Sequence, residues 1–230
     1  MSLSVIVPVL NEASGLASTL RQTRQPGVRE IIVVDGGSDD GTVDIAQPLA
    51  DVVVAAPRGR ASQMNEGARR ARGDVLLFLH GDTVLPNGFA RDVLAACTEP
   101  GVVGGRFDVR LEPSSRLLRL TAFLINLRSR LSRIATGDQA IFVHREVFER
   151  LGGYAAIPLM EDIDFSKRLK RIGRIACLRQ QVITSSRRWR ELGVVRTILL
   201  MWSLRFLYFC GVAPQTLKRA YSDARQSKRN

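Results

Sequence analysis

Residues 76–82 read Leu-Leu-Phe-Leu-His-Gly-Asp, an apolar run that ends on the acid Asp82. Residues 31–35 read Ile-Ile-Val-Val-Asp and end in the same way on Asp35. Continuous apolar runs of this length are typical of strands that are buried on both faces of a parallel sheet. Ligands of such sheets bind beyond the carboxyl ends of the strands, and a carboxylate without a partner is costly there. The two acids therefore indicate a ligand site at this edge.

Strands and helices alternate along the first hundred residues. Strand-like runs lie at about 4–10, 30–34, 51–55 and 74–79, and helical patterns follow them at about 14–25, 42–49, 60–72 and 86–97. This alternation predicts an α/β fold with a doubly wound, mostly parallel sheet and right-handed crossovers.

Beyond residue 100 the pattern becomes less regular. We expect strands near 102–109, 140–143 and 181–184, and helices near 114–134 and 162–172. An apolar helix with scattered arginines follows at about 190–210, and the polar end of the chain is expected to fray. The pattern predicts one large α/β unit with a C-terminal helical appendage.

The formal net charge of +12 is unevenly distributed along the chain. Residues 1–105 hold 9 basic and 12 acidic side chains, whereas residues 184–230 hold 10 basic and 2 acidic ones. Such an asymmetry suggests a partner with negative charge, which can be a set of phosphates, a lipid surface or nucleic acid.

Cysteine usage and hydropathy indicate the cellular compartment of the protein. The 3 cysteines are widely spaced and only 2 histidines are present, so we expect reduced thiols rather than disulfides or a zinc cluster. No signal peptide is visible at the start of the sequence. The most apolar stretch, 194–212, is interrupted by Arg196 and Arg205, which argues against a spanning helix. These patterns predict a cytoplasmic protein.

Five short motifs resemble those of family 2 glycosyltransferases. They are, in order, Val5-Ile6-Val7-Pro8-Val9-Leu10-Asn11-Glu12, Val33-Val34-Asp35-Gly36-Gly37-Ser38-Asp39-Asp40-Gly41-Thr42, the strand that ends at Asp82, Gly137-Asp138 and Glu161-Asp162. Any one of them alone is a weak signal, but all five at these intervals across about residues 3–185 form a specific pattern. Within the family, the chain looks most like a small bacterial group associated with arsenosugar biosynthesis.

The resemblance implies the GT-A fold and an inverting transfer of a sugar. The donor is a nucleoside-diphosphate sugar, and the acceptor is a hydroxyl on a small molecule or a lipid-linked compound. Residues 1–185 are then the glycosyltransferase domain, in which 1–105 bind the nucleotide sugar and 106–185 form the acceptor side. Residues 186–230 form a basic and apolar C-terminal helix and tail.

The resemblance places the nucleotide sugar against the ends of the first strands. It implies donor contacts from Pro8, Val9, Asn11, Glu12, Asp35, Gly37, Arg60, Gln63, His80 and Gly81. Glu12 can reach the ribose hydroxyls, as acids do in dinucleotide sites, although an acid is also favoured at a helix start by the macrodipole. Arg60 can approach the phosphates, or it is a solvated loop arginine. Gly36 stands where the family usually has a second acid, which leaves the donor base open.

Asp82 is expected to bind a divalent cation. The family reads Asp-x-Asp at this place, and the present chain has His80-Gly81-Asp82, so only the last carboxylate is kept. Mg²⁺ or Mn²⁺ fits such a site, because these ions accept one or two carboxylates together with substrate phosphates. A cation there would neutralise the charge that develops on the departing nucleoside diphosphate. His80 either lines the ribose or supports the loop.

Catalysis of an inverting transfer needs a base for the acceptor hydroxyl proton. The resemblance assigns this role to Asp162, with Glu161 as the second choice, and it assigns Gly137 and Asp138 to the acceptor side. A structural alternative also exists for the acid pair, because carboxylates are favoured in the first turn of any helix.

Residues 187–212 combine a basic cluster with an apolar helix, which suits a helix lying in a membrane interface. The alternative is a helix that packs on the sheet or on a second subunit. We therefore expect a peripheral position on the inner face of the membrane, or a homo-oligomer, as further possibilities for this cytoplasmic protein.

Two other functions share part of the pattern. A nucleotidyltransferase, or another Rossmann-like nucleotide enzyme, would use the N-terminal half but has no use for Glu161-Asp162. A non-catalytic binder of phosphate-rich ligands would explain the charge of +12. The basic residues have few aromatic neighbours in the sequence, however, so we expect no nucleic acid partner.

Overall fold

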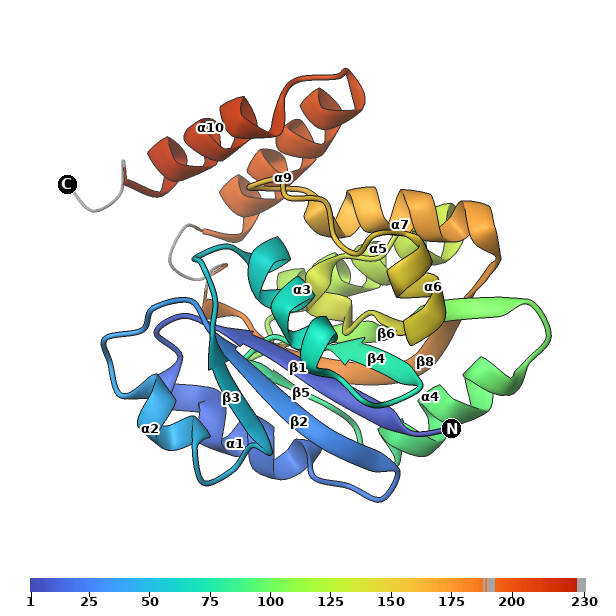
Figure 1. Cartoon of the computed structure of the whole chain (residues 1–230). Coiled ribbons are helices and arrows are strands. Elements are labelled where there is room, and N and C mark those ends of the chain that lie inside the picture. The colour runs from blue at the N-terminus through green and yellow to red at the C-terminus, as the bar shows by residue number, and fades with distance from the viewer. Residues whose placement is uncertain (188, 190–192, 227–230) are drawn as a thin grey trace.

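A computed structural model describes residues 1–187, 189 and 193–226. Its centre is one eight-stranded sheet with the order β3-β2-β1-β4-β7-β6-β8-β5 (Figure 1). The strands are β1 (Leu3–Val9), β2 (Val28–Asp35), β3 (Val52–Ala55), β4 (Val75–Phe78), β5 (Thr83–Val84), β6 (Val102–Glu112), β7 (Phe142–His144) and β8 (Arg174–Ser185).

The first four strands of this order, from β3 to β4, are parallel. Every residue of β1 is buried, as the continuous apolar run predicts for a central strand covered on both faces. In the register of the sheet, Val9 lies beside Asp35 and Ile6 lies beside Phe78. The carboxyl ends of β1, β2 and β4 therefore meet at one edge.

The second part of the sheet is mixed. β7 runs antiparallel to both β4 and β6, whereas β6 and β8 are parallel. The predicted mostly parallel α/β sheet is confirmed. The expected strand at 181–184 is too short, because β8 begins at Arg174 and pairs with β6 along its length. Its exposed middle lacks the apolar pattern that would have predicted a strand.

Helices cover both faces of the sheet. One face packs against α1 (Ala13–Thr23), α2 (Thr42–Ala46) and α4 (Phe89–Thr98), and the other packs against α3 (Arg60–Arg70), α6 (Arg145–Arg150) and α7 (Glu161–Ile172). Alternate residues of β1 serve the two cores, because Val5 and Val7 join the first and Ile6 joins the second. α5 (Arg116–Ser132) lies along β6.

A helical hairpin ends the described chain and stands at one end of the molecule (Figure 1). It consists of α9 (Val194–Phe209) and α10 (Pro214–Gln226). Leu204 of α9 packs with Leu217 and Tyr221 of α10 and with Met160 before α7. The expected helix at 190–210 corresponds to α9, which begins at Val194. Residues 190–192 lie outside the described residues. The expectation that the end of the chain frays is wrong as far as Gln226, because α10 continues to that residue. Leu217 and Tyr221 lie on one face of this helix and are buried.

Within residues 1–187, 189 and 193–226, no helix is both long enough and apolar enough to cross a membrane.

Candidate active site

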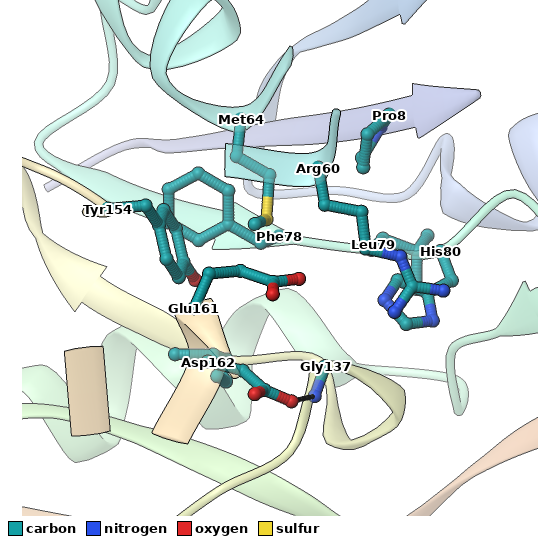
Figure 2. Close-up of a pocket in the computed structure, with 11 residues that line it drawn as sticks. Pro8, Arg60, Met64, Phe78, Leu79, His80, Gly137, Tyr154, Glu161 and Asp162 are labelled. Carbon is teal, nitrogen blue, oxygen red and sulfur yellow. Dashed lines mark hydrogen bonds between the residues drawn. The ribbon is translucent and has the colours of Figure 1, made fainter. Parts of the chain in front are cut away.

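A small cleft opens where the ends of β1 and β4 face the start of α7 (Figure 2). It is lined by Pro8, Arg60, Met64, Phe78, Leu79, His80, Gly137, Ile141, Tyr154, Glu161 and Asp162. Six of the predicted site residues thus come together here from distant parts of the sequence. They are Pro8, Arg60, His80, Gly137, Glu161 and Asp162.

Asp162 lies in the first turn of α7 and is held in place by backbone groups. Its Oδ2 accepts a hydrogen bond from the N–H of Gly137 at 2.8 Å, and its Oδ1 accepts one from the N–H of Ile163 at 2.7 Å. Two backbone donors of this kind fix the orientation of the carboxylate. Figure 2 shows this carboxylate pointing from α7 toward the backbone of Gly137. The site therefore contains one oriented carboxylate on the side facing residue 137.

Glu161 is the neighbouring acid, but its surroundings differ. Glu161 is buried and only 6% exposed to solvent. Burial, together with the charge of Asp162, raises the pKa of Glu161 to about 7, and Arg60 opposes the shift. Two adjacent carboxyl groups in unlike environments are suited to separate tasks in proton transfer.

The loop before β7 is packed tightly against His80. A Cβ atom on Gly137 would lie 2.7 Å from Nε2 of His80 and 3.8 Å from Oδ2 of Asp162. A side chain at this position would require the ring or the loop to shift. The next residue, Asp138, is half-buried and accepts a hydrogen bond from the hydroxyl of Thr136.

The donor-side acids gather at the adjacent rim of the cleft. Both carboxylate oxygens of Glu12 lie 3.2 Å from a guanidinium nitrogen of Arg187. Burial raises the pKa of Glu12, the Arg187 charge opposes this shift, and the charge of Asp82 adds to it. Gly81, the residue before Asp82, lies close to Glu12, since a Cβ atom on Gly81 would lie 3.3 Å from Val9 and 3.4 Å from Glu12. Glu12 and Asp82 are therefore neighbours across Gly81.

The residues around Asp82 can bind a cation only if the substrate and water supply most of its ligands. Among the described residues, no group of three or more His, Cys, Asp or Glu side chains is positioned to hold a metal ion. A protein-only cage is thus not formed by this part of the chain. A single half-buried carboxylate at Asp82 does suit Mg²⁺ or Mn²⁺ that takes its other ligands from a diphosphate and water.

Asp35 and Asn11 build the loop at 36–41. The carboxylate of Asp35 accepts hydrogen bonds from the N–H of Gly37 at 2.8 Å and the N–H of Ser38 at 3.0 Å. Asn11 accepts one from the N–H of Asp39 at 3.1 Å. The two predicted donor contacts therefore hold the loop beside the cleft in a fixed shape.

Gln63 joins the ends of two strands. Its side-chain amide donates to the carbonyl oxygens of Val9 and Val34, both at 2.8 Å. A Cβ atom on Gly36 would lie 3.0 Å from the same amide nitrogen. Gln63 thus occupies the space that a larger residue at position 36 would need.

Comparison with known proteins identifies the family. The model described as Glycosyl transferase family 2 matches residues 4–157. The chain belongs to glycosyl transferase family 2.

Two named glycosyltransferases illustrate the likeness in sequence. Over 168 residues the chain is 32% identical to glycosyltransferase AglJ of Haloferax volcanii, and the match covers 70% of this chain and 52% of AglJ. Over 181 residues it is 32% identical to the PGL/p-HBAD biosynthesis glycosyltransferase of Mycobacterium bovis, covering 72% and 68%. The chain thus spans about half the length of AglJ.

Solved structures of glycosyltransferases share the architecture. Glucosyl-3-phosphoglycerate synthase from Mycobacterium tuberculosis superposes with a TM-score of 0.66 at 22% identity, covering 92% of this chain and 80% of that one. TarS from S. aureus superposes with a TM-score of 0.66 at 18% identity, covering 81% and 59%. The predicted GT-A fold is confirmed by these superpositions.

Several residues of the family 2 site were not expected from the sequence. Tyr154 lines the cleft and is buried at its floor, where its ring lies 5.0 Å from that of Phe78. Asn65 holds the turn that delivers it, through two hydrogen bonds of 2.9 Å with the backbone of Tyr154. Arg187 was grouped with the membrane-interface segment, yet it pairs with Glu12. None of these three residues stands at a motif spacing that would have revealed its role.

The rest of the basic cluster is only partly described. Arg188 and Arg190 lie outside the described residues. Trp189 packs against a small apolar cluster that contains Leu111 and Leu118. This part of the segment therefore contacts the domain.

Proposed function

We propose that this chain transfers a sugar from a nucleoside-diphosphate sugar to a hydroxyl acceptor, with inversion at the anomeric carbon. The observation that carries the proposal is the position of Asp162. Its carboxylate is fixed by the N–H of Gly137 in the same cleft as the donor-side residues Pro8, Arg60 and His80. A base and a donor-binding edge on two sides of one cleft are what a displacement at C1 requires.

Asp162 has the central role in the proposed reaction. The acceptor oxygen attacks C1 of the sugar from the side opposite the diphosphate, and its proton passes to Asp162. The bond between C1 and the diphosphate oxygen breaks as the new bond forms, so the configuration at C1 inverts. Arg60 is suited to the phosphates, and Glu12 to the ribose hydroxyls. A cation held by Asp82 would neutralise charge on the leaving group.

Named complexes of similar structures support the donor class. The mycobacterial synthase is described with Mn²⁺ and uridine diphosphate, and TarS with UDP-GlcNAc. A mannosyltransferase from Pyrobaculum calidifontis, with a TM-score of 0.62 at 23% identity, is described with GDP-Man and Mn²⁺. These donors differ in base and sugar, so the proposal for this chain names the class of nucleoside-diphosphate sugars.

Thermal unfolding with nucleoside diphosphates tests the donor proposal. We expect at least one nucleoside diphosphate to raise the unfolding temperature with Mn²⁺ or Mg²⁺, and to raise it less after chelation. Turnover with the matching sugar nucleotide should release the nucleoside diphosphate. Release of pyrophosphate instead would favour a nucleotidyltransferase and contradict the proposal.

We also propose that the chain binds the surface of an anionic membrane from the cytoplasmic side. α5 and α9 contact each other, and both expose large apolar side chains. These include Phe123 and Leu131 on α5, at 60% and 78% exposed, and Trp202 and Phe206 on α9, at 62% and 68%. Apolar faces of this kind beside an excess of basic residues suit a lipid interface.

Co-sedimentation with vesicles tests the membrane proposal. Vesicles containing phosphatidylglycerol should retain the wild type and release the double variant Phe123→Ser, Phe206→Ser. Ile172→Ser is the matched control, because Ile172 is an exposed apolar residue on α7. Equal retention of the double variant would contradict the proposal. A wild-type dimer that the double variant loses would assign this surface to a homo-oligomer instead.

A further inference from the structure

Two arginines on neighbouring helices have buried nitrogens for which the described residues provide no hydrogen bond. They are Arg128 of α5 and Arg205 of α9. Nε and Nη2 of Arg128 and Nε of Arg205 are buried, and none has a hydrogen-bond partner within the described residues. A buried donor that is left unsatisfied on a charged group costs more than one on a neutral group. Such nitrogens call for a partner that belongs to a ligand or to solvent.

Electrostatic effects show which charged groups lie near Arg128. Burial and the charge of Arg205 lower the pKa of Arg128 to about 10, whereas Asp138 and Asp162 oppose the shift. Arg128 therefore lies within electrostatic reach of Arg205 and of both acids. Its whole side chain is half-buried, so part of it faces solvent.

Arg128 differs from two neighbouring arginines that form ion pairs. Arg106 and Arg130 both pair with the carboxylate of Asp108. No carboxylate lies within 4.0 Å of Arg128 among the ion pairs of the described chain. The two nearby acids already accept other hydrogen bonds, because Asp162 binds the N–H of Gly137 and Asp138 binds the hydroxyl of Thr136.

We propose that Arg128 and Arg205 together bind a phosphate group of the acceptor. This inference rests on the proposed function, because it assigns the acceptor to the Asp162 side of the cleft. Water could satisfy the buried N–H groups, but only an anion also removes the repulsion between two guanidinium groups. A phosphate offers several oxygens to planar guanidinium donors and is a preferred ligand of arginine.

The position of the pair separates this phosphate from those of the donor. Arg60 and Glu12 mark the donor side, near the ends of β1 and β4. Arg128 and Arg205 come from α5 and α9, and the acids that influence Arg128 are Asp138 and Asp162. A phosphate held there would place the rest of the acceptor beside Asp162, where its hydroxyl can lose a proton.

The phosphate can belong to a soluble ester or to a lipid. α5 and α9 also present the exposed apolar side chains of Phe123 and Phe206, which a lipid chain could contact. Two pairs of probes distinguish these sources by calorimetric titration. Glycerol 3-phosphate is compared with glycerol, and farnesyl phosphate is compared with farnesol.

The wild type should bind one phosphorylated probe more tightly than its neutral counterpart, and Arg128→Gln and Arg205→Gln should each weaken that binding by about tenfold or more. Arg128→Lys should retain part of it. Arg119→Gln is the matched control, because Arg119 is exposed on the same helix. A preference for glycerol 3-phosphate identifies a soluble acceptor, and a preference for farnesyl phosphate identifies a lipid.

Arg60→Gln tests whether the probe has entered the donor site instead. Loss of phosphate binding in Arg60→Gln, with retention in Arg128→Gln and Arg205→Gln, would overturn the inference. Equal binding of phosphorylated and neutral probes by the wild type would also overturn it. If Arg128→Gln does not fold, Arg128→Lys and Arg205→Gln decide the result. Nucleoside diphosphate binding with Mn²⁺, measured on the same samples, tests the donor proposal separately.

Discussion

The carboxylate of Glu12 lies 3.2 Å from the guanidinium of Arg187, and 175 residues of chain separate the two. This ion pair connects the loop after β1 with the segment after β8. It therefore ties the donor side of the cleft to the start of the C-terminal region. Because Asp82 lies close to Glu12, Arg187 also offsets the negative charge of this rim.

Arg187→Gln should weaken nucleoside diphosphate binding and shift its pH dependence. An ion pair of this exposure contributes about 0.2–1 kcal/mol, so we expect binding to weaken by about 1.4- to fivefold. Burial already raises the pKa of Glu12 and Arg187 opposes this shift. Without Arg187 the pKa rises further, so Glu12 is protonated at a higher pH and the acid limb of binding moves upward.

Titration calorimetry across a pH series measures this effect. Arg187→Lys is the control, since it keeps the charge and should keep most of the affinity. An unchanged pH profile in Arg187→Gln would show that Glu12 does not contact the nucleotide.

Glu161 should make the protein less stable as the pH rises. Its pKa is about 7 in the folded state, mainly because of burial, against an ordinary value of 4.5. Between these two values the folded state keeps a proton that the unfolded state has lost, so the free energy of unfolding falls with increasing pH. Glu161→Gln removes the titrating group and should flatten this dependence.

Urea unfolding of both proteins over the same pH range measures the difference. Above about pH 7 the variant should be the more stable of the two. Parallel curves for the wild type and Glu161→Gln would show that burial does not raise the pKa of this carboxyl group.

Asp162→Asn should abolish transfer while leaving donor binding intact. The amide oxygen of asparagine can still accept the hydrogen bond from Gly137, while the one from Ile163 loses its acceptor. The proton acceptor is lost, and general base catalysis is worth about 10²–10⁴ in rate. We expect a fall in kcat of that order with an unchanged nucleoside diphosphate affinity.

Asp82→Asn is the informative comparison, because it should instead weaken the Mn²⁺-dependent part of nucleotide binding. Both effects are measured by steady-state kinetics together with calorimetry. A full rate in Asp162→Asn would exclude this residue as the base, and Glu161 would be the remaining acid of the pair.

The sequence predicted correctly those parts of the fold that depend on local pattern. Asp35 ends the parallel strand β2 and Asp82 follows β4 after a short loop. Because the ends of such strands meet at one edge, that edge could be predicted from the apolar runs. Glu161 and Asp162 stand together at a helix start for the same local reason. In contrast, tertiary packing fixes the charged neighbours of Arg128, the ion pair of Arg187 and the burial of the Tyr154 ring. No periodicity or spacing carries that information.

Packing around Gly36 explains how the loop tolerates a glycine at this position. The family usually has an acid there, and the donor base was left open for that reason. The structure places the amide of Gln63 where a Cβ atom on Gly36 would be 3.0 Å away. The glycine and the glutamine therefore fit each other, and the loop keeps its shape without the second acid.

Gly137→Ala should reduce turnover through His80. The added methyl group would lie 2.7 Å from Nε2 of His80, closer than unstrained atoms approach, so the ring or the loop must move. Because the N–H of Gly137 positions Asp162, a moved loop displaces the base. His80→Ala removes the obstacle, and the double variant His80→Ala, Gly137→Ala should therefore recover kcat relative to Gly137→Ala alone.

Double-mutant kinetics measure this coupling, since residues in contact give effects that do not add. Gly152→Ala is a control for backbone strain alone, because Gly152 has a φ of +70° and no atom within 4 Å of an added Cβ. It should destabilise the protein without lowering kcat of the folded fraction. If the effects of His80→Ala and Gly137→Ala simply add, the contact between the ring and the loop does not position Asp162.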